Sequence, residues 1–356
     1  MATDPLHSTD ARPGFARTLR AMPPPVDRPR AGVLEAIGGT PLVRLERAFS
    51  GFPIDVWAKL EETNPGGSVK ARAATSMLRA ALDDGRVRPG GTVVESSSGN
   101  MGVGLAQACR YLDLRFVCVV DSRTCESKRR LMQAYGAEVL LITEPDPETG
   151  DLLTARLNAV AAIVRETPGA FWPDQYANAA NAAAHATGTM REIDAALDGE
   201  VDYVFVATST GGTLRGCHDY LRENGRTTTL VAVDAEGSVL FGGTRGRRLL
   251  PGFGAGIETR LSQPAVFDRL ERVSDLDCVV GCRRLVEREA VLAGASSGGL
   301  VTALERLAPT MAAGSRCALV CADGGTAYLD TVYDDEWVAE QLACDTAELA
   351  RRVARA

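Results

Sequence analysis

Short apolar segments alternate with segments of helical periodicity along most of this chain. Near-continuous apolar runs such as Arg115–Asp121 and Tyr203–Ala207 are typical of strands that are buried on both faces of a sheet. Because strands and helices alternate, the sequence predicts an α/β fold with parallel sheets flanked by helices. We expect strands at Thr92–Glu95, Arg115–Asp121, Glu138–Ile142, Tyr203–Ala207, Leu230–Asp234 and Arg316–Cys321, and helices at Gly102–Leu112, Ser127–Tyr135, Leu152–Arg165, Ala179–Leu197, Leu214–Arg222, Cys282–Ala293 and Leu300–Leu307.

The length of 356 residues favours two domains, at about 150 residues per domain. Two blocks of alternating strands and helices meet near residues 145–175, where the sequence EPDPETGD predicts a surface turn. Residues 1–30 show little periodicity, which indicates a flexible leader; the alternative is an arm that packs on a partner subunit. Ligands of such folds bind beyond the carboxyl ends of the strands, in the crevice between the blocks.

The composition argues against several classes of function. The net charge of −7 disfavours a nucleic-acid binder, and no apolar run approaches the roughly 20 residues of a membrane helix. The first ten residues lack the order of a secretory signal, so we expect a cytoplasmic protein. The three histidines lie in unrelated contexts and the nine cysteines form no CxxC pair. We therefore expect no metal site, and we expect most thiols to be buried and reduced.

Lysine is scarce in this chain, which contains only Lys59, Lys70 and Lys128. Lys70 lies in the segment NPGGSVKAR, which predicts a loop that opens a helix running through Arg79. The start of a helix carries partial positive charge, which disfavours an ammonium and lowers its pKa, as a lysine that forms a Schiff base requires. On local features alone, an exposed lysine after a turn is the alternative.

Three further polar, glycine-rich loops are each expected to lead into a helix. The loop ESSSGNM at residues 95–101 offers hydroxyls, an amide and free N–H groups to a carboxylate, or it is a plain serine-rich cap. The loop TSTGGT at residues 208–213 suits a phosphate, and the absence of a P-loop lysine disfavours ATP; a tight turn is the alternative. The fourth loop, GASSGG, spans residues 294–299.

The order of these loops resembles the β-family (fold type II) of pyridoxal-phosphate enzymes, which includes cysteine synthase and cystathionine β-synthase. The segments IGGTPL at residues 37–42 and PGFGAG at residues 251–256 also look like family motifs, and the resemblance covers roughly residues 32–335. It implies two three-layer (αβα) domains with parallel sheets and pyridoxal 5'-phosphate as the cofactor. Residues 75–175 would form a smaller mobile domain that carries the carboxylate loop. Residues 31–74 and 176–340 would form the larger domain, followed by a C-terminal helix or tail at 341–356.

The same resemblance implies roles for individual residues. Lys70 would be the Schiff-base lysine, Asn100 would contact the ring hydroxyl of the cofactor, and Ser296 would face its pyridine nitrogen. A hydroxyl at that nitrogen cannot keep the ring firmly protonated, which favours prompt β-elimination over transamination. The cofactor's phosphate would be held by Ser209, Thr210, Gly211, Gly212 and Thr213. Residues expected to bind substrates are Ser97, Ser98, Asn100, Met101, Gln175, Tyr176, Ser209 and Arg156.

Departures from the cysteine synthase pattern indicate a branch of the family. Cysteine synthases generally have Thr, Gly and Phe where this chain has Met101, Ser209 and Tyr176. The last two changes add hydroxyl donors, which suit a nucleophile that carries two carboxylates better than sulfide. The pattern looks most like the N-(2-amino-2-carboxyethyl)-L-glutamate synthases, which use O-phospho-L-serine and L-glutamate to make a precursor of 2,3-diaminopropionate.

Alternatives remain open at this point. The chain could be a cysteine or cystathionine synthase, or a catalytically silent binder of the cofactor. Tyr176 could be a core aromatic residue, Met101 a packing residue and Arg156 part of a solvated helix face. The resemblance also implies a homodimer.

Overall fold

The computed structural model describes residues 29–122, 124–150 and 152–354. The chain divides into Met1–Ala31 and one compact unit, Gly32–Ala356. The leader predicted at residues 1–30 lies outside the described residues, apart from its last two. Within the described residues, no helix is both long enough and apolar enough to cross a bilayer.

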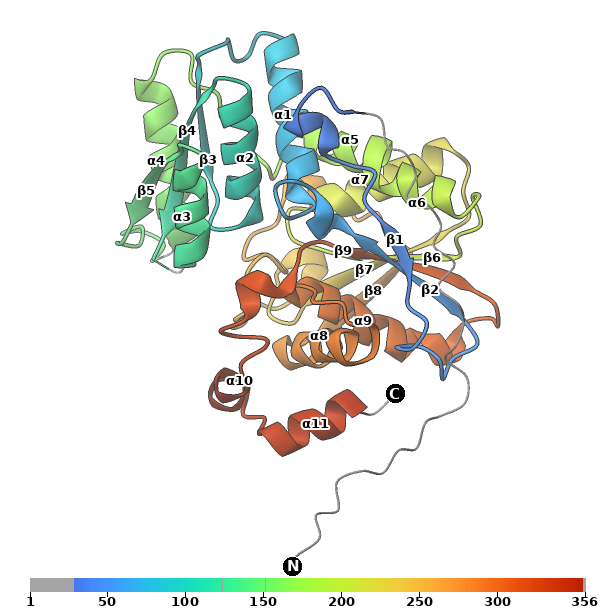
Figure 1. Ribbon diagram of the computed structural model, residues 1–356. Coiled ribbons are helices and arrows are strands. Elements are labelled where there is room, and N and C mark those ends of the chain that lie inside the picture. Colours follow the sequence, from blue (N-terminus) through green and yellow to red (C-terminus); the bar gives the residue numbers. More distant parts are fainter. Residues whose placement is uncertain (1–28, 123, 151, 355–356) are drawn as a thin grey trace, which may run out of the picture. The chain divides into compact units, whose positions relative to one another are not determined.

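A three-stranded parallel sheet holds β3 (Thr92–Ser96), β4 (Arg115–Asp121) and β5 (Glu138–Ile142), in that order. Successive side chains of a strand point to opposite faces, and both faces of this sheet are apolar. Phe116, Cys118 and Val120 pack on one face with residues of α2 and α3, while Val117 and Val119 pack on the other with α4. The covering helices are α2 (Asn100–Tyr111), α3 (Glu126–Ala134) and α4 (Leu152–Glu166) (Figure 1).

A six-stranded sheet has the order β1-β2-β9-β6-β7-β8, and it is parallel except that β1 runs antiparallel to β2. Val204 and Val206 of its central strand β6 face helices α6 and α7, whereas Phe205 faces α8 and α9. Figure 1 shows these two pairs of helices on opposite faces of the sheet. The inner strands β9, β6 and β7 therefore bury both of their faces, as the apolar runs predict. The elements are β1 (Leu42–Arg44), β2 (Asp55–Leu60), β6 (Tyr203–Ala207), β7 (Thr229–Ala235), β8 (Arg269–Val273), β9 (Arg316–Cys321), α6 (Arg191–Ala196), α7 (Gly212–Glu223), α8 (Asp275–Glu289) and α9 (Ala295–Leu307).

Helix α1 (Lys70–Asp83) packs between α2 and α5 (Ala179–Ala184) and so connects the regions around the two sheets (Figure 1). Its approach to α2 is close because Gly104 has no side chain: a Cβ there would lie 3.1 Å from the carbonyl oxygen of Lys70. The first turn of α1 is therefore held against α2, the helix into which the carboxylate loop (residues 95–101) leads.

The α/β class and the parallel sheets are confirmed, and the strands predicted at 115–121, 138–142, 203–207 and 316–321 have the predicted bounds. For the helix predicted at Cys282–Ala293, both predicted ends are wrong. It begins at Asp275, where Ser274 and Asp277 form a reciprocal cap, and it ends at Glu289, because Ala290 is left-handed. The helix predicted over 179–197 is interrupted by a π-helical segment, His185–Met190.

Several elements were missed by the sequence prediction, namely β1, β2 and β8. Helix α10 (Asp335–Leu342) overlaps the start of the C-terminal segment expected at 341–356, and helix α11 (Thr346–Ala354) lies within that segment. Helix α11 is anchored where Arg284 Nε of α8 donates to the carbonyl oxygen of Val353 at 3.0 Å. Short 3₁₀ turns occupy Val33–Ala36, Glu61–Thr63, Leu240–Gly242, Arg260–Ser262, Ala308–Thr310 and Gly325–Tyr328. Eight of the nine cysteines are buried and all nine are free thiols, as predicted, with Cys125 exposed.

Candidate active site

Lys70 is the first residue of α1, and the end of β9 fixes its position. Val69 N–H donates to the carbonyl oxygen of Ala322 at 2.8 Å, and Ser68 forms an isolated bridge with Asp323. Burial lowers the pKa of the Lys70 amine, while the nearby carboxylate of Asp323 acts in the opposite direction. A desolvated lysine amine is more readily neutral and can act as a nucleophile or a base.

The glycine-rich loop between β6 and α7 forms a tight cradle. Gly211 has a φ of +88°, and a Cβ there would lie 2.7 Å from the backbone nitrogen of Ser262. A Cβ on Gly212 would lie 2.2 Å from Asn181 Oδ1, so neither position accepts a side chain without rearrangement. The first-turn N–H groups of α7 have no partner within the helix and are suited to an anion.

Lys70 and the cradle line one small cavity together with Ser296 of α9. Its wall includes Ser209 and Thr213 from the cradle. The cavity thus brings together an amine, an anion cradle and a hydroxyl from three separate parts of the chain. These are the groups that pyridoxal phosphate needs for its aldehyde, its phosphate and its ring nitrogen, so the residues present fit this cofactor. Thr210 Oγ1 accepts from Gly212 N–H at 3.3 Å and supports the loop from within.

The carboxylate loop lies at the carboxyl end of β3, before α2. Ser97 Oγ accepts from Gly102 N–H at 2.9 Å, and Ser98 Oγ accepts from Arg156 at 2.6 Å. Arg156 Nε also lies 3.3 Å from Asp121 Oδ2, and its side chain is only 9% exposed. The alternative of a solvated helix face for Arg156 is therefore wrong, because this guanidinium is buried and supports the loop.

Asn100 connects this loop to two residues that the sequence analysis did not single out for the site. Its Nδ2 donates to Asp323 Oδ2 at 2.7 Å, and its Oδ1 accepts from Lys128 Nζ at 2.5 Å. Asp323 is buried and also accepts from the Tyr328 hydroxyl at 3.0 Å, while its Oδ1 has no hydrogen-bond partner among the described residues. A sequence signal existed for Asp323, because it follows the last predicted strand directly, in the polar segment ADGG.

Gln175 and Tyr176 lie beside the carboxylate loop. Gln175 Nε2 donates to the carbonyl oxygen of Ser96 at 3.2 Å, and its backbone N–H donates to Glu95 Oε2 at 3.2 Å. Glu95 is fully buried at the end of β3, and burial raises its pKa to about 7. Burial also raises the pKa of the half-buried Tyr176 to about 12, so its phenol remains a hydrogen-bond donor at neutral pH.

Met101 differs from its neighbours in the loop. Its side chain is 2% exposed and packs in the apolar cluster with Leu105 and Met132. The side chain therefore faces the core, which agrees with a packing role.

A buried network of charges lies behind the first turn of α1. Arg72 donates to both carboxylate oxygens of Glu61 at 2.7 and 2.9 Å and to both oxygens of Glu192 at 2.7 Å. Lys59 Nζ, which is 2% exposed, donates to Glu192 at 2.7 Å. Although burial opposes ionisation, Arg72 and Lys59 hold the pKa of Glu192 near 2. Arg72 lies two residues beyond Lys70, so the network ties the first turn of α1 to β2 and to α6.

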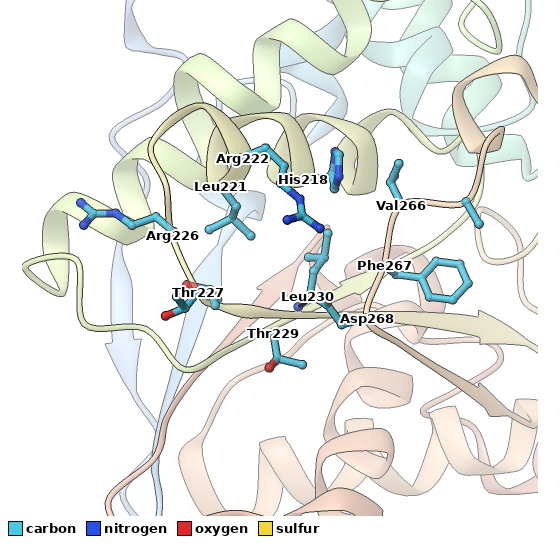
Figure 2. A pocket seen from close by; sticks show the side chains of 12 residues that line it. His218, Leu221, Arg222, Arg226, Thr227, Thr229, Leu230, Val266, Phe267 and Asp268 are labelled. Atoms are coloured by element: carbon cyan, nitrogen blue, oxygen red, sulfur yellow. Dashed lines mark hydrogen bonds between the residues drawn. The ribbon is translucent and has the colours of Figure 1, made fainter.

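A second, larger cavity lies between α7 and the segment that leads into β8. Figure 2 shows His218, Leu221 and Arg222 of α7 on one side and Val266 and Phe267 on the other. No predicted site residue lines it. We assign the active site to the smaller cavity because the amine and the anion cradle converge there. In the part of the chain that the structure describes, no three His, Cys, Asp or Glu side chains are grouped to hold a metal ion.

Comparisons with known proteins identify the family of this chain. The protein family described as "Pyridoxal-phosphate dependent enzyme" matches residues 33–323. An N-(2-amino-2-carboxyethyl)-L-glutamate synthase from Ralstonia nicotianae is 42% identical over 311 residues, which cover 87% of this chain and 92% of the relative. A synthase of the same name from Cupriavidus metallidurans is 39% identical over 314 residues, covering 87% of this chain and 92% of the relative.

Solved structures of related enzymes share the fold. An O-acetylserine dependent cystathionine β-synthase from Helicobacter pylori has a TM-score of 0.79 at 27% identity, covering 86% of this chain and 99% of that one. An O-ureido-L-serine synthase has a TM-score of 0.80 at 29% identity, covering 88% and 100%. The chain therefore belongs to the family of pyridoxal-phosphate dependent enzymes and has its fold type II architecture.

Proposed function

We propose that this enzyme joins O-phospho-L-serine and L-glutamate into N-(2-amino-2-carboxyethyl)-L-glutamate and phosphate, by replacement at Cβ of the serine. The observation that supports this most is the 42% identity, over 87% of the chain, to a synthase of that name. The product would be a precursor of 2,3-diaminopropionate in a siderophore or peptide natural product.

In this proposal the small cavity holds the cofactor. Lys70 would bind it covalently, the loop Ser209–Thr213 would bind its phosphate, and Ser296 would lie at the ring nitrogen. When bound, pyridoxal phosphate withdraws electrons from Cα of an amino acid and so makes the Cα proton acidic. Ser296 offers the nitrogen a hydroxyl without negative charge, which suits elimination from Cβ better than transamination.

Lys70 would move the proton in both halves of the reaction. Once released from the cofactor, its amine takes the proton from Cα, and it returns a proton there after the nucleophile has added. A lowered pKa suits this role, since a neutral amine is needed before the proton can be taken.

The carboxylate loop would bind the α-carboxylate of the serine substrate. Ser97, Ser98 and Asn100 supply side-chain donors, and the first-turn N–H groups of α2 supply backbone donors. Arg156 supports Ser98 from behind, and Met101 shapes the loop by packing.

Glutamate would be received by Gln175, Tyr176 and Ser209. The phenol of Tyr176 stays protonated, so it can donate to a carboxylate of the incoming nucleophile. A sulfide nucleophile needs few such donors, which distinguishes this proposal from a cysteine synthase. A cysteine or cystathionine synthase is the second candidate, supported by the similarity to the Helicobacter pylori enzyme at 27% identity.

The test compares two donors and two nucleophiles on the purified holoenzyme. Phosphate release from O-phospho-L-serine with glutamate should match, mole for mole, a product whose mass is that of the joined amino acids. A higher kcat/KM for O-acetyl-L-serine with sulfide would reassign the enzyme to the cysteine synthases.

A further inference from the structure

Lys128 is a cation beside the carboxylate loop for which the proposed reaction has no role so far. It is half-buried on α3, near the start of that helix, and its Nζ donates to Asn100 Oδ1 at 2.5 Å. The chain has 39 Lys and Arg, of which three are lysines, so this is one of very few ammonium groups. It lies beyond the carboxyl end of β4, which is paired in parallel with β3.

Among the described residues, no direct ion pair neutralises the charge of Lys128. Its helix neighbours Arg129 and Arg130 both pair with Glu126. No carboxylate lies within 4.0 Å of Lys128 Nζ in the part of the chain that the structure describes, and the hydrogen bonds that link Asp323 to it pass through Asn100. Burial lowers the pKa of Lys128, while Asp323 and Cys125 act against this. A partly desolvated ammonium without a direct counterion is well placed to bind an anion.

The other cation beside this loop is already engaged. Arg156 donates to Ser98 and lies 3.3 Å from Asp121. Lys70 is required for the cofactor and for proton transfer in the proposed reaction. Among the described cations that contact this loop, Lys128 is therefore the one that is left for an anionic group of the substrate.

O-phospho-L-serine carries two anionic groups. Its α-carboxylate is matched by the hydroxyls of the carboxylate loop and the first-turn N–H groups of α2. Its phosphate needs a cation more strongly, because it carries nearly two negative charges and three acceptor oxygens. An acetyl ester has no such charge.

We propose that Lys128 binds the phosphate group of O-phospho-L-serine and selects it over O-acetyl-L-serine. This inference rests on the proposed function. When the Cβ–O bond breaks, both electrons of the bond pass to the phosphate oxygen, and the ammonium stabilises the charge of the departing phosphate without giving up its proton. Because the same ammonium contacts Asn100, phosphate binding is coupled to the carboxylate loop.

The experiment measures kcat/KM of the holoenzyme for both donors, with glutamate fixed, in three variants. Lys128→Gln keeps a donor for Asn100 but removes the charge, and Lys128→Arg keeps the charge. Arg130→Gln, on the exposed side of the same helix, is the matched control.

A hydrogen bond between charged groups is worth about 10- to 150-fold in rate. Lys128→Gln should lose that factor with O-phospho-L-serine and less than about 3-fold with O-acetyl-L-serine. Lys128→Arg should recover part of the loss, and Arg130→Gln should match the wild type.

Inhibition by inorganic phosphate gives an independent readout, and its Ki should rise in Lys128→Gln by a similar factor. Equal losses with both donors would show that Lys128 only positions Asn100, and would overturn the inference. An effect confined to the KM of glutamate would overturn it as well. If the wild type does not use O-phospho-L-serine at all, the proposed function itself fails, which is a different result from a wild type that uses it and a variant that loses nothing.

Discussion

Lys70 is the residue on which the site depends most. It begins α1, its amine is partly buried, and it lines the cavity with Ser209, Thr213 and Ser296. The three hydroxyl residues lie 139 or more positions after Lys70 in the sequence, so no local pattern could show that they meet this lysine.

Borohydride reduction of the holoenzyme should fix the cofactor on Lys70. Peptide mapping then identifies the modified lysine among the three in the chain. Lys70→Ala should lose the covalent attachment and turnover, because neither Lys59 nor Lys128 lines the cavity. Attachment to either of these two lysines would contradict the assignment.

Glu95 predicts a change of stability with pH. Burial raises its pKa in the folded protein from about 4.5 to about 7. Between these values the folded state holds a proton that the unfolded state has lost, so the free energy of unfolding falls as the pH rises. At about 1.4 kcal/mol per unit, the loss amounts to roughly 3 kcal/mol.

Glu95→Gln should lack this loss, because its amide does not titrate. Urea denaturation of the wild type and the variant at pH 5 and pH 8 measures the difference. The wild type should lose more stability than the variant between the two pH values. An identical change in both proteins would mean that Glu95 does not titrate in this window.

The sequence predicted the residues of the cavity better than the residues around Asn100. Lys70, the cradle and Ser296 each lie in a glycine- and hydroxyl-rich loop, which is a local signal. Asp323 and Lys128 reach Asn100 only because the segments that follow β3, β4 and β9, which belong to two different sheets, come together in the folded chain. Their contacts depend on the folded arrangement, so the sequence pattern could not reveal them.

At the scale of elements, the buried ion network fixes the start of α1. Glu61 is fully buried and Arg72 is 6% exposed, so each charge depends on its partners. The network joins β2, α1 and the helix α6 that follows the π-helical segment. A Cβ on Gly188 of that segment would lie 2.7 Å from Arg72 Nη1, so a larger residue there would displace this end of the guanidinium.

Arg72→Met should destabilise the fold by about 3–5 kcal/mol, because it leaves buried carboxylates without their cation. Arg79→Met, at an exposed position of the same helix, is the control and should change stability by less than about 0.5 kcal/mol. Chemical denaturation of both variants tests this. A loss below about 1 kcal/mol for Arg72→Met would show that the network contributes little.

The sequence predicts a strand correctly where both faces of that strand are buried. Strands β4, β6 and β9 bury both faces and so read as continuous apolar runs. The short edge strand β1 is largely exposed, and β8 carries two arginines and a glutamate, so neither shows such a run. Helix α8 was misplaced because its polar first turn, capped by Ser274, hides the true start.

At the scale of the whole molecule, the alternation of strands and helices predicted parallel sheets with a site at their carboxyl ends. The strand order could not be predicted, because β9 lies between β2 and β6 although it is the last strand in the chain. That insertion brings Asp323 between Lys70 and Asn100. A mobile smaller domain at 75–175 and a homodimer stay predictions.

In the proposed reaction the enzyme joins the nitrogen of glutamate to Cβ of serine. The most direct measurement offers the holoenzyme O-phospho-L-serine with equal concentrations of [15N]glutamate, sulfide and homocysteine, and identifies the products by mass spectrometry. The main product should be N-(2-amino-2-carboxyethyl)-L-glutamate that retains the 15N label, with one phosphate released per molecule. Cysteine or cystathionine as the main product would contradict the proposed reaction.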